Sequence, residues 1–156
     1  MKLKTVINIH LFLMAFLAIS AIGGGGALFI SPSGKLLGGM PLSLLKNSPF
    51  KDFFYPGLIL FLVLGILPCL VVFSLIKKPE NNLAEGINFF KDMHWAWTFS
   101  IYIAFALIIW LQIEMYFLQA VGWLHSFYMF LAILMIFVAL LPKVRTHYTK
   151  DDKSIN

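Results

Sequence analysis

The chain has 156 residues, of which 60% are apolar and only 12% charged, and its formal net charge is +5 at pH 7. This composition excludes an ordinary water-soluble globule and leaves room for one domain, so lipid is the expected solvent for most of the surface. The positive charge does not indicate nucleic acid, because the basic residues flank apolar runs, where anionic lipid headgroups account for them. The single cysteine, Cys69, excludes an internal disulfide and a CxxC redox pair.

Four apolar runs follow one another along the chain, at residues 6–30, 56–76, 96–118 and 124–141. Each is about as long as the 17 to 25 residues that a helix needs to cross a hydrocarbon core of about 30 Å. The runs predict an all-α membrane protein, an antiparallel bundle of four transmembrane helices in a single domain at residues 1–142. A polar tail follows at residues 143–156, and we expect it to be frayed and cytoplasmic.

The lysines and arginines are divided unequally between the loops. Nine lie before the first run, between the second and third, or after the fourth, and only three lie between the first and second. This bias predicts that both termini and the inner loop 77–94 are cytoplasmic, in a multi-pass protein of the cell inner (plasma) membrane. Trp95 and Trp97, at the start of the third run, are expected in the inner aromatic belt.

The first run has an alternative interpretation as a secretory signal peptide. Lys2 and Lys4 would supply its positive region, and Ala18-Ile19-Ser20 resembles a small-residue cleavage site. The run is longer than the usual apolar region of about 7 to 15 residues, which favours a membrane helix.

Four consecutive glycines, Gly23 to Gly26, lie within the first run. With Ser20 and Ala21 they place small residues four apart, a spacing that lets a neighbouring helix approach closely. Each glycine costs up to about 1 kcal/mol in a helix relative to alanine, so we expect the helix to loosen or unwind there. Close helix packing and an approach site for a ligand are the two interpretations.

The outer loop, residues 31–55, is too apolar to be freely solvated, with five leucines between residues 36 and 45. We expect this loop to pack over the outer mouth of the bundle or to lie in the headgroup layer, with a short helix near residues 41–46. In the second run, Pro68 lacks a backbone donor and crowds the carbonyl of Leu64, which predicts a kink near mid-membrane.

Glu114 is the one acidic residue inside an apolar run, and an intramembrane carboxylate is a functional-site hypothesis by default. It lies roughly 25 Å along the third helix at 1.5 Å per residue, near the outer headgroups, within reach of His125 or a lysine of the outer loop. The two interpretations of Glu114 are interfacial or structural hydrogen bonding, and a binding or proton-handling role. The predicted ligand-binding residues form what we term the outer polar set: Glu114, Gln112, Tyr116, Gln119, His125, Gly24 and Gly25.

Motifs of known chemistry are missing from the sequence. It contains no HExxH or HxxxH pair, no GxSxG turn and no phosphate-binding glycine loop. We therefore predict no catalytic residues, no metal and no cofactor. The expected partners are membrane lipids, a small lipophilic ligand, and a membrane protein or a second copy of the chain, with no nucleic acid.

Residues 25–57 carry the pattern GG-x-L-F…P-S-G…M-P-L…S-P-F-x-D-F…P-G. This pattern resembles that of small uncharacterised four-helix bacterial membrane proteins. The resemblance implies a bacterial inner-membrane setting and the same bundle, and it carries no activity.

These observations favour a non-enzymatic accessory or lipophilic-ligand-binding membrane protein. The alternative is a structural or interaction subunit of a larger membrane complex. A transporter or intramembrane enzyme is less favoured, because it needs polar groups that reach mid-membrane or a convergent catalytic set. The first function predicts a largely apolar cavity, and the second predicts an exposed seam of small residues.

Overall fold

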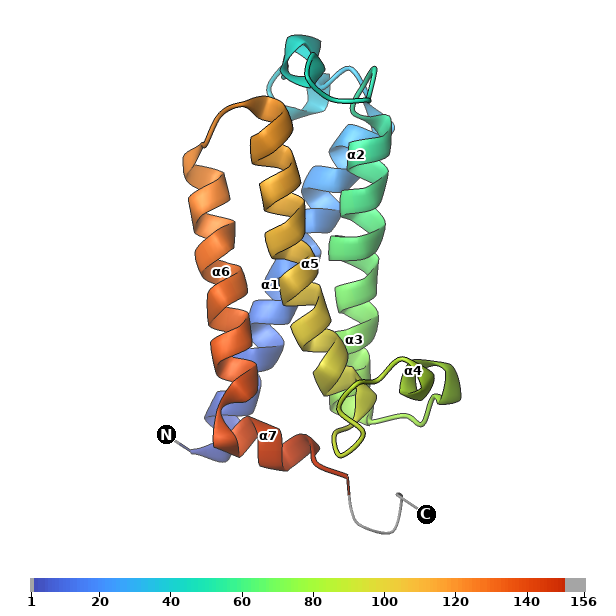
Figure 1. Ribbon diagram of the computed structural model, residues 1–156, viewed down its shortest axis with the longest axis vertical. Helices are drawn as coiled ribbons and strands as arrows, with labels where there is room; N and C mark the ends of the chain where they lie inside the picture. Colours follow the sequence, from blue (N-terminus) through green and yellow to red (C-terminus); the bar gives the residue numbers. More distant parts are fainter. Residues whose placement is uncertain (1, 151–156) are drawn as a thin grey trace.

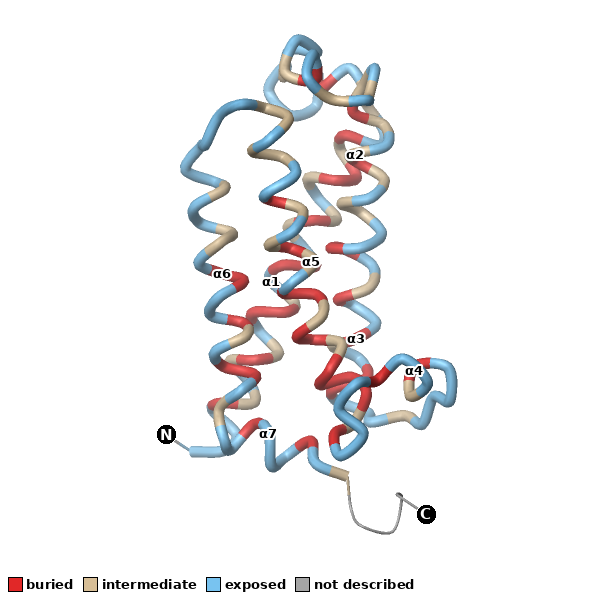
Figure 2. Tube along the Cα trace, in the orientation of Figure 1, coloured by how far each residue is buried: buried red, intermediate tan, exposed pale blue. Residues whose placement is uncertain are grey.

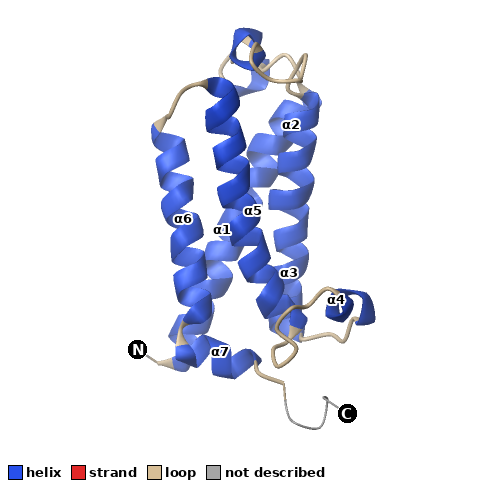
Figure 3. Cartoon of the chain, viewed as in Figure 1, coloured by secondary structure: helices blue, strands red, loops and turns tan. Residues whose placement is uncertain are grey.

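The computed structural model describes residues 2–150, and within this range every regular element is a helix (Figures 1 and 3). Four of the helices found there are long and apolar enough to cross a membrane: α1 (Leu3–Ile30), the continuous helix Phe54–Lys77, α5 (Trp95–Leu118) and α6 (Trp123–Leu140). The all-helical prediction is confirmed, and these helices begin and end close to the four apolar runs. A helix satisfies its own backbone groups, which is why apolar length alone locates it.

The four long helices contact one another in a ring. Helix α1 packs against the helix Phe54–Lys77 on one side and against α6 on the other, and α5 packs against both of these partners. Figure 1 places residues 31–53 and 119–122 at one end of the long axis, which we term the upper end. The N-terminus, residues 78–94 and the last helix, α7 (Pro142–Tyr148), lie at the other, lower end.

The second long helix changes its geometry along its length. It begins as α2 (Phe54–Ile59), continues as a π-helical segment (Leu60–Ile66) and ends as α3 (Leu67–Lys77). The N–H of Leu67 donates to the carbonyl of Leu62, five residues back rather than four. Pro68 has no N–H to offer the carbonyl of Leu64, so the wider turn precedes it. The predicted effect of the proline therefore takes the form of a π-helical segment on its N-terminal side.

Three glycines produce the tightest contact of the upper half, between α1 and the helix Phe54–Lys77. A Cβ on Gly25 would lie 2.6 Å from the backbone nitrogen of Phe61, and one on Gly57 would lie 2.7 Å from the backbone nitrogen of Phe29. Gly65 meets Ile22 in the same way, at 2.8 Å from its side chain. The expected loosening at the four glycines is wrong, because α1 is helical throughout. Close backbone packing offsets their low helix propensity.

The connection at the upper end folds on itself. It contains two 3-10 helices, Lys35–Leu37 and Leu42–Leu45, and the second confirms the short helix predicted near residues 41–46. Leu45 and Phe53 bury against Leu28 of α1, and the ring of Phe50 meets that of Phe117 in α5.

The lower end departs most from expectation. Residues 142–148 form α7 instead of a frayed tail, with Val144 and Tyr148 fully buried; residues 151–156 of the predicted tail lie outside the described range. Trp95 and Trp97 are also buried rather than placed in an aromatic belt, and the indole of Trp97 donates to the carbonyl of Ala139 at 2.9 Å. Figure 2 shows buried positions along the lower part of α5 and in α7. Both predictions were wrong because the loop 78–94 and α7 cover this end of the bundle.

Candidate functional site

The outer polar set is dispersed over the upper half of the molecule. Gln112 and Tyr116 of α5 and Gln119, directly after its end, are exposed, and the amide nitrogen of Gln119 donates to the carbonyl of Tyr116 at 2.6 Å. Glu114 is half-buried and forms no ion pair with any residue in the described range. His125 accepts a hydrogen bond from the backbone N–H of Gly122 at 3.0 Å and thus caps α6. No hydrogen bond joins Glu114 to His125 within residues 2–150.

The two predicted glycines have different surroundings. Gly25 is buried against the backbone of the facing helix, while a Cβ on Gly24 would meet nothing within 4 Å. Gly25 therefore acts in helix packing, and Gly24 lies on an open face of α1. A vestibule that unites these glycines with Glu114 stays a prediction.

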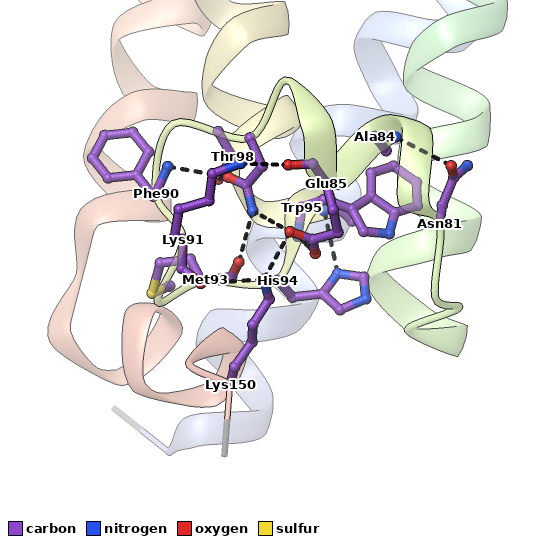
Figure 4. Close-up of polar contacts among 12 residues, drawn as sticks. Asn81, Ala84, Glu85, Phe90, Lys91, Met93, His94, Trp95, Thr98 and Lys150 are labelled. Carbon is purple, nitrogen blue, oxygen red and sulfur yellow. Dashed lines mark hydrogen bonds and ion pairs between the residues drawn. The ribbon is translucent and has the colours of Figure 1, made fainter. Parts of the chain in front are cut away.

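The lower end contains a polar network that includes Glu85, Thr98 and Lys150 (Figure 4). At its centre is Asn88, which is 1% exposed. Its amide nitrogen donates to the carboxylate of Glu85 at 3.0 Å and to the carbonyl of Met93 at 2.9 Å. Its amide oxygen accepts from the hydroxyl of Thr98 at 2.6 Å and from the N–H of Phe90 at 3.1 Å. Each of these bonds links the loop 78–94 to itself or to α5. Asn88 thus fixes the loop against the start of α5, the third of the long helices.

Glu85 joins this network to the C-terminal segment. Its carboxylate accepts from the ammonium of Lys150 at 2.7 Å, while the backbone N–H of Lys150 donates to the carbonyl of Asp92. Burial alone would raise the pKa of Glu85, but the hydrogen bonds from Lys150 and Asn88 outweigh it and lower the pKa. A second pair, Arg145 with Asp92 at 3.5 Å, is more exposed. Two charged pairs therefore hold residues 145–150 onto the loop.

Helix α7 carries Tyr148 into the interior. The ring of Tyr148 lies 6.5 Å from that of His10 in α1, and the ammonium of Lys78 lies 5.0 Å from the centre of the Tyr148 ring. The hydroxyl of Tyr148 and both ring nitrogens of His10 are buried with no hydrogen-bond partner in the described part of the chain. Burial raises the pKa of Tyr148 to about 12, so the phenol is neutral and acts as a packing group.

A cleft of about 310 Å³ opens beside this network, between α3, the segment 79–84 and the start of α5. Its wall is mainly apolar, and two of its residues, Leu70 and Phe73 of α3, are more than half exposed. The volume is at the lower end of the roughly 300 to 1,000 Å³ of small-molecule sites. The lining consists of Leu67, Leu70, Val71, Phe73, Ser74, Pro79, Glu80, Asn81, Ala84, Trp95 and Phe99.

Two interactions shape the wall of this cleft. The indole of Trp95 donates to the carbonyl of Pro79 at 2.9 Å, which holds the segment after α3 against α5. The side chain of Asn81 accepts from the N–H groups of Leu83 and Ala84 and begins the short helix α4 (Asn82–Gly86). The cleft is therefore built by the same loop that the Asn88 network fixes.

The residues of this end carried little signal in the sequence. Asn81 before a short polar stretch is a recognisable N-cap, but Glu85 and Lys150 are 65 positions apart and no local pattern joins them. Among the residues searched, no group of three His, Cys, Asp or Glu side chains is arranged to hold a metal ion. Comparison with protein-family models, curated proteins and solved structures finds no match to this chain, so the geometry carries the functional argument.

Proposed function

We propose that this chain is a multi-pass protein that crosses a bacterial inner membrane as an antiparallel four-helix bundle, with the connection 31–53 packed over its outer mouth. The unequal distribution of basic residues supports a lower end in the cytoplasm. In this orientation the residues that carry the charge bias, Lys77, Lys91 and Lys143 among them, lie at the level of the inner headgroups. The resemblance in residues 25–57 supports the bacterial setting.

The function that we propose is non-enzymatic binding of a lipophilic ligand in the cleft beside α3. The single observation that carries it is the apolar cleft itself, whose lining includes the exposed side chains of Leu70 and Phe73. A ligand dissolved in the bilayer would enter from the side without crossing water. This location differs from the vestibule expected near Glu114, since the loop 78–94 at the lower end supplies one wall of the cleft.

The hydroxyl of Ser74, in the lining of the cleft, and the amide of Asn88, in the adjoining loop, are both engaged within the fold, which supports binding rather than catalysis. Ser74 donates its hydroxyl hydrogen to the carbonyl of Leu70 at 2.8 Å, and Asn88 uses both ends of its amide in bonds to the loop 78–94 and to Thr98 of α5. Groups occupied in this way hold the structure and leave little for a reaction.

Native mass spectrometry of the protein in mild detergent tests the proposal. Leu70→Trp fills the mouth of the cleft and should reduce the amount of co-purifying lipophile severalfold. Leu62→Trp is the matched control, since Leu62 is similarly exposed on the same helix and does not line the cleft. Equal loss in both variants, or no loss in either, would contradict a ligand site at this place.

A second function is favoured by a specific feature of α1. Ser20, Gly23, Gly24 and Ala27 form a seam of small residues at helical spacing, and a Cβ on Gly23 or Gly24 would meet nothing within 4 Å. Such a seam suits close approach by a helix of another protein or a second copy. Gly24→Leu should then abolish a complex that the wild type shows in the same mass spectra, while a wild type that is monomeric and without a partner would count against an interaction subunit.

A further inference from the structure

Glu80 is the one charged residue among the eleven that line the cleft. It is exposed, and it makes no hydrogen bond or ion pair with any residue of the described chain. The two other acidic residues described at the lower end are both paired, Glu85 with Lys150 and Asp92 with Arg145. The cleft therefore has a negative, unpaired group at its polar rim.

Lys78 is the basic residue closest to Glu80 in the sequence, and its ammonium makes contacts elsewhere in the fold. The ammonium of Lys78 donates to the carbonyl of His147 at 2.8 Å and lies over the ring of Tyr148. The left-handed conformation of Lys78, at φ 49°, ends α3 and turns the chain toward Pro79. Glu80 thus remains available to a cation from outside the protein.

Asn81 supplies a hydrogen-bond donor at the same rim, where Glu80 supplies an acceptor. Its amide oxygen is occupied by the two N–H groups at the start of α4. Its amide nitrogen donates to nothing in residues 2–150, and the side chain is exposed. One acceptor with negative charge and one neutral donor therefore lie next to each other, above an apolar wall.

Resting on the ligand site proposed above, we infer that the occupant of the cleft is a zwitterionic phospholipid with a primary ammonium headgroup. Its ammonium bonds to the carboxylate of Glu80, its phosphate accepts from the amide of Asn81, and part of an acyl chain lies against Leu70 and Phe73. An anionic lipid or a free fatty acid places negative charge beside Glu80 and is disfavoured. A primary ammonium offers three N–H donors, whereas a trimethylammonium headgroup offers none.

The test compares lipid retention in bilayer discs that contain equal amounts of phosphatidylethanolamine, phosphatidylglycerol and phosphatidylcholine. Native mass spectrometry after extraction should show that the wild type retains phosphatidylethanolamine over the other two by about 2- to 5-fold, the range of an exposed ion pair. Glu80→Gln should remove this preference while total bound lipid stays. Asp92→Asn makes the same change of charge at the same end, away from the cleft, and should keep the preference.

The outcomes separate this inference from the function on which it rests. If Leu70→Trp reduces bound lipid but the wild type shows no preference for phosphatidylethanolamine, the cleft binds lipophiles and the assignment of headgroup is wrong. If Asp92→Asn abolishes the preference as fully as Glu80→Gln, overall charge selects the lipid and Glu80 has no special part. Displacement of the lipid by excess free ethanolamine would identify a soluble amine as the ligand instead.

Discussion

The two ends of the bundle organise their polar residues in opposite ways. At the lower end, Asn88 and Glu85 collect hydrogen bonds from the loop 78–94, from α5 and from the C-terminal segment. At the upper end, Glu114 and His125 lie on separate helices without a bond between them, and the connection 31–53 is held mainly by backbone turns and a small apolar cluster. A polar residue inside an apolar run is therefore a poorer guide to an organised site than a loop whose polar residues are buried.

The largest expected effect is at the centre of the lower network. Asn88→Ala removes four hydrogen bonds and leaves buried partners unsatisfied, so the free energy of unfolding should fall by about 2 to 4 kcal/mol. Denaturant titration of the detergent-solubilised protein, followed by circular dichroism, measures it. Asn47→Ala is the same change on an exposed residue of the upper connection and should stay within about 0.5 kcal/mol. Similar losses in both variants would erase the contrast between the ends.

The next effect concerns the tightest contact of the upper half. Gly25→Ala places a methyl group against the backbone of Phe61 and should lower the free energy of unfolding by about 1 to 3 kcal/mol. Gly24→Ala has open space and should be neutral or stabilising by up to about 1 kcal/mol, since alanine favours the helix. The same titration compares them, and a tolerated Gly25→Ala would show that the helices can separate at no cost.

Acid should loosen the lower end before the upper. Burial lowers the pKa of His94 and His147 below the ordinary 6.5, so their neutral forms stabilise the fold above pH 6.5 and this contribution is lost as the pH falls. The lowered pKa of Glu85 adds stability that is lost further down, as the pH falls below the ordinary 4.5. Hydrogen exchange of residues 142–150 at several pH values measures both steps.

Glu85→Gln provides the control for the acid experiment. It should remove the step below pH 4.5 and leave the step near 6.5 in place. Exchange at residues 31–53 that rises in parallel with that of residues 142–150 would mean that acid acts on the whole bundle, and the lower network would lose its separate role.

The smallest effect is expected at Glu114. Because this carboxyl makes no ion pair within the described residues, Glu114→Gln should leave folding and the amount of co-purifying lipid unchanged. Native mass spectrometry and thermal unfolding in detergent check both. Loss of a bound lipophile in this variant, with the cleft variants unaffected, would move the ligand site to the upper end.

The positions of the long helices could be predicted from the sequence because apolar length and backbone satisfaction are local properties. The run at residues 96–118 becomes α5 at Trp95–Leu118, and a short helix near residue 42 follows from leucines with proline before them. The burial of Trp97 could not be predicted in this way. An indole at the end of an apolar run suits a headgroup belt and a buried contact equally, and its partner Ala139 is 42 positions away.

The candidate site was harder to predict for the same reason. In the sequence, Glu80 and Asn81 are ordinary loop residues. They line an apolar cleft because the indole of Trp95 bonds to the carbonyl of Pro79 and holds this segment against α5. The burial of α7 is a similar case, since Val144 and Tyr148 are apolar positions in a polar stretch too short to predict a helix. These features depend on contacts between residues far apart in the sequence, and local periodicity does not predict such contacts.

The π-helical segment Leu60–Ile66 also constrains how this chain can change its length. A wider turn holds one residue more than an α-turn, and each residue rotates a helix by about 100°. Above it, Gly57 is aligned with α1; below it, Val71 and Ser74 are aligned with the interior. Removing a single residue there would restore uniform α geometry and leave the two halves of the helix in phase. The same deletion within α2 or α3 would rotate one half of the helix by about 100° relative to the other and carry one wall of the cleft away from α5. The π-helical segment is therefore the place where this helix can lose one residue and keep both of its packing faces.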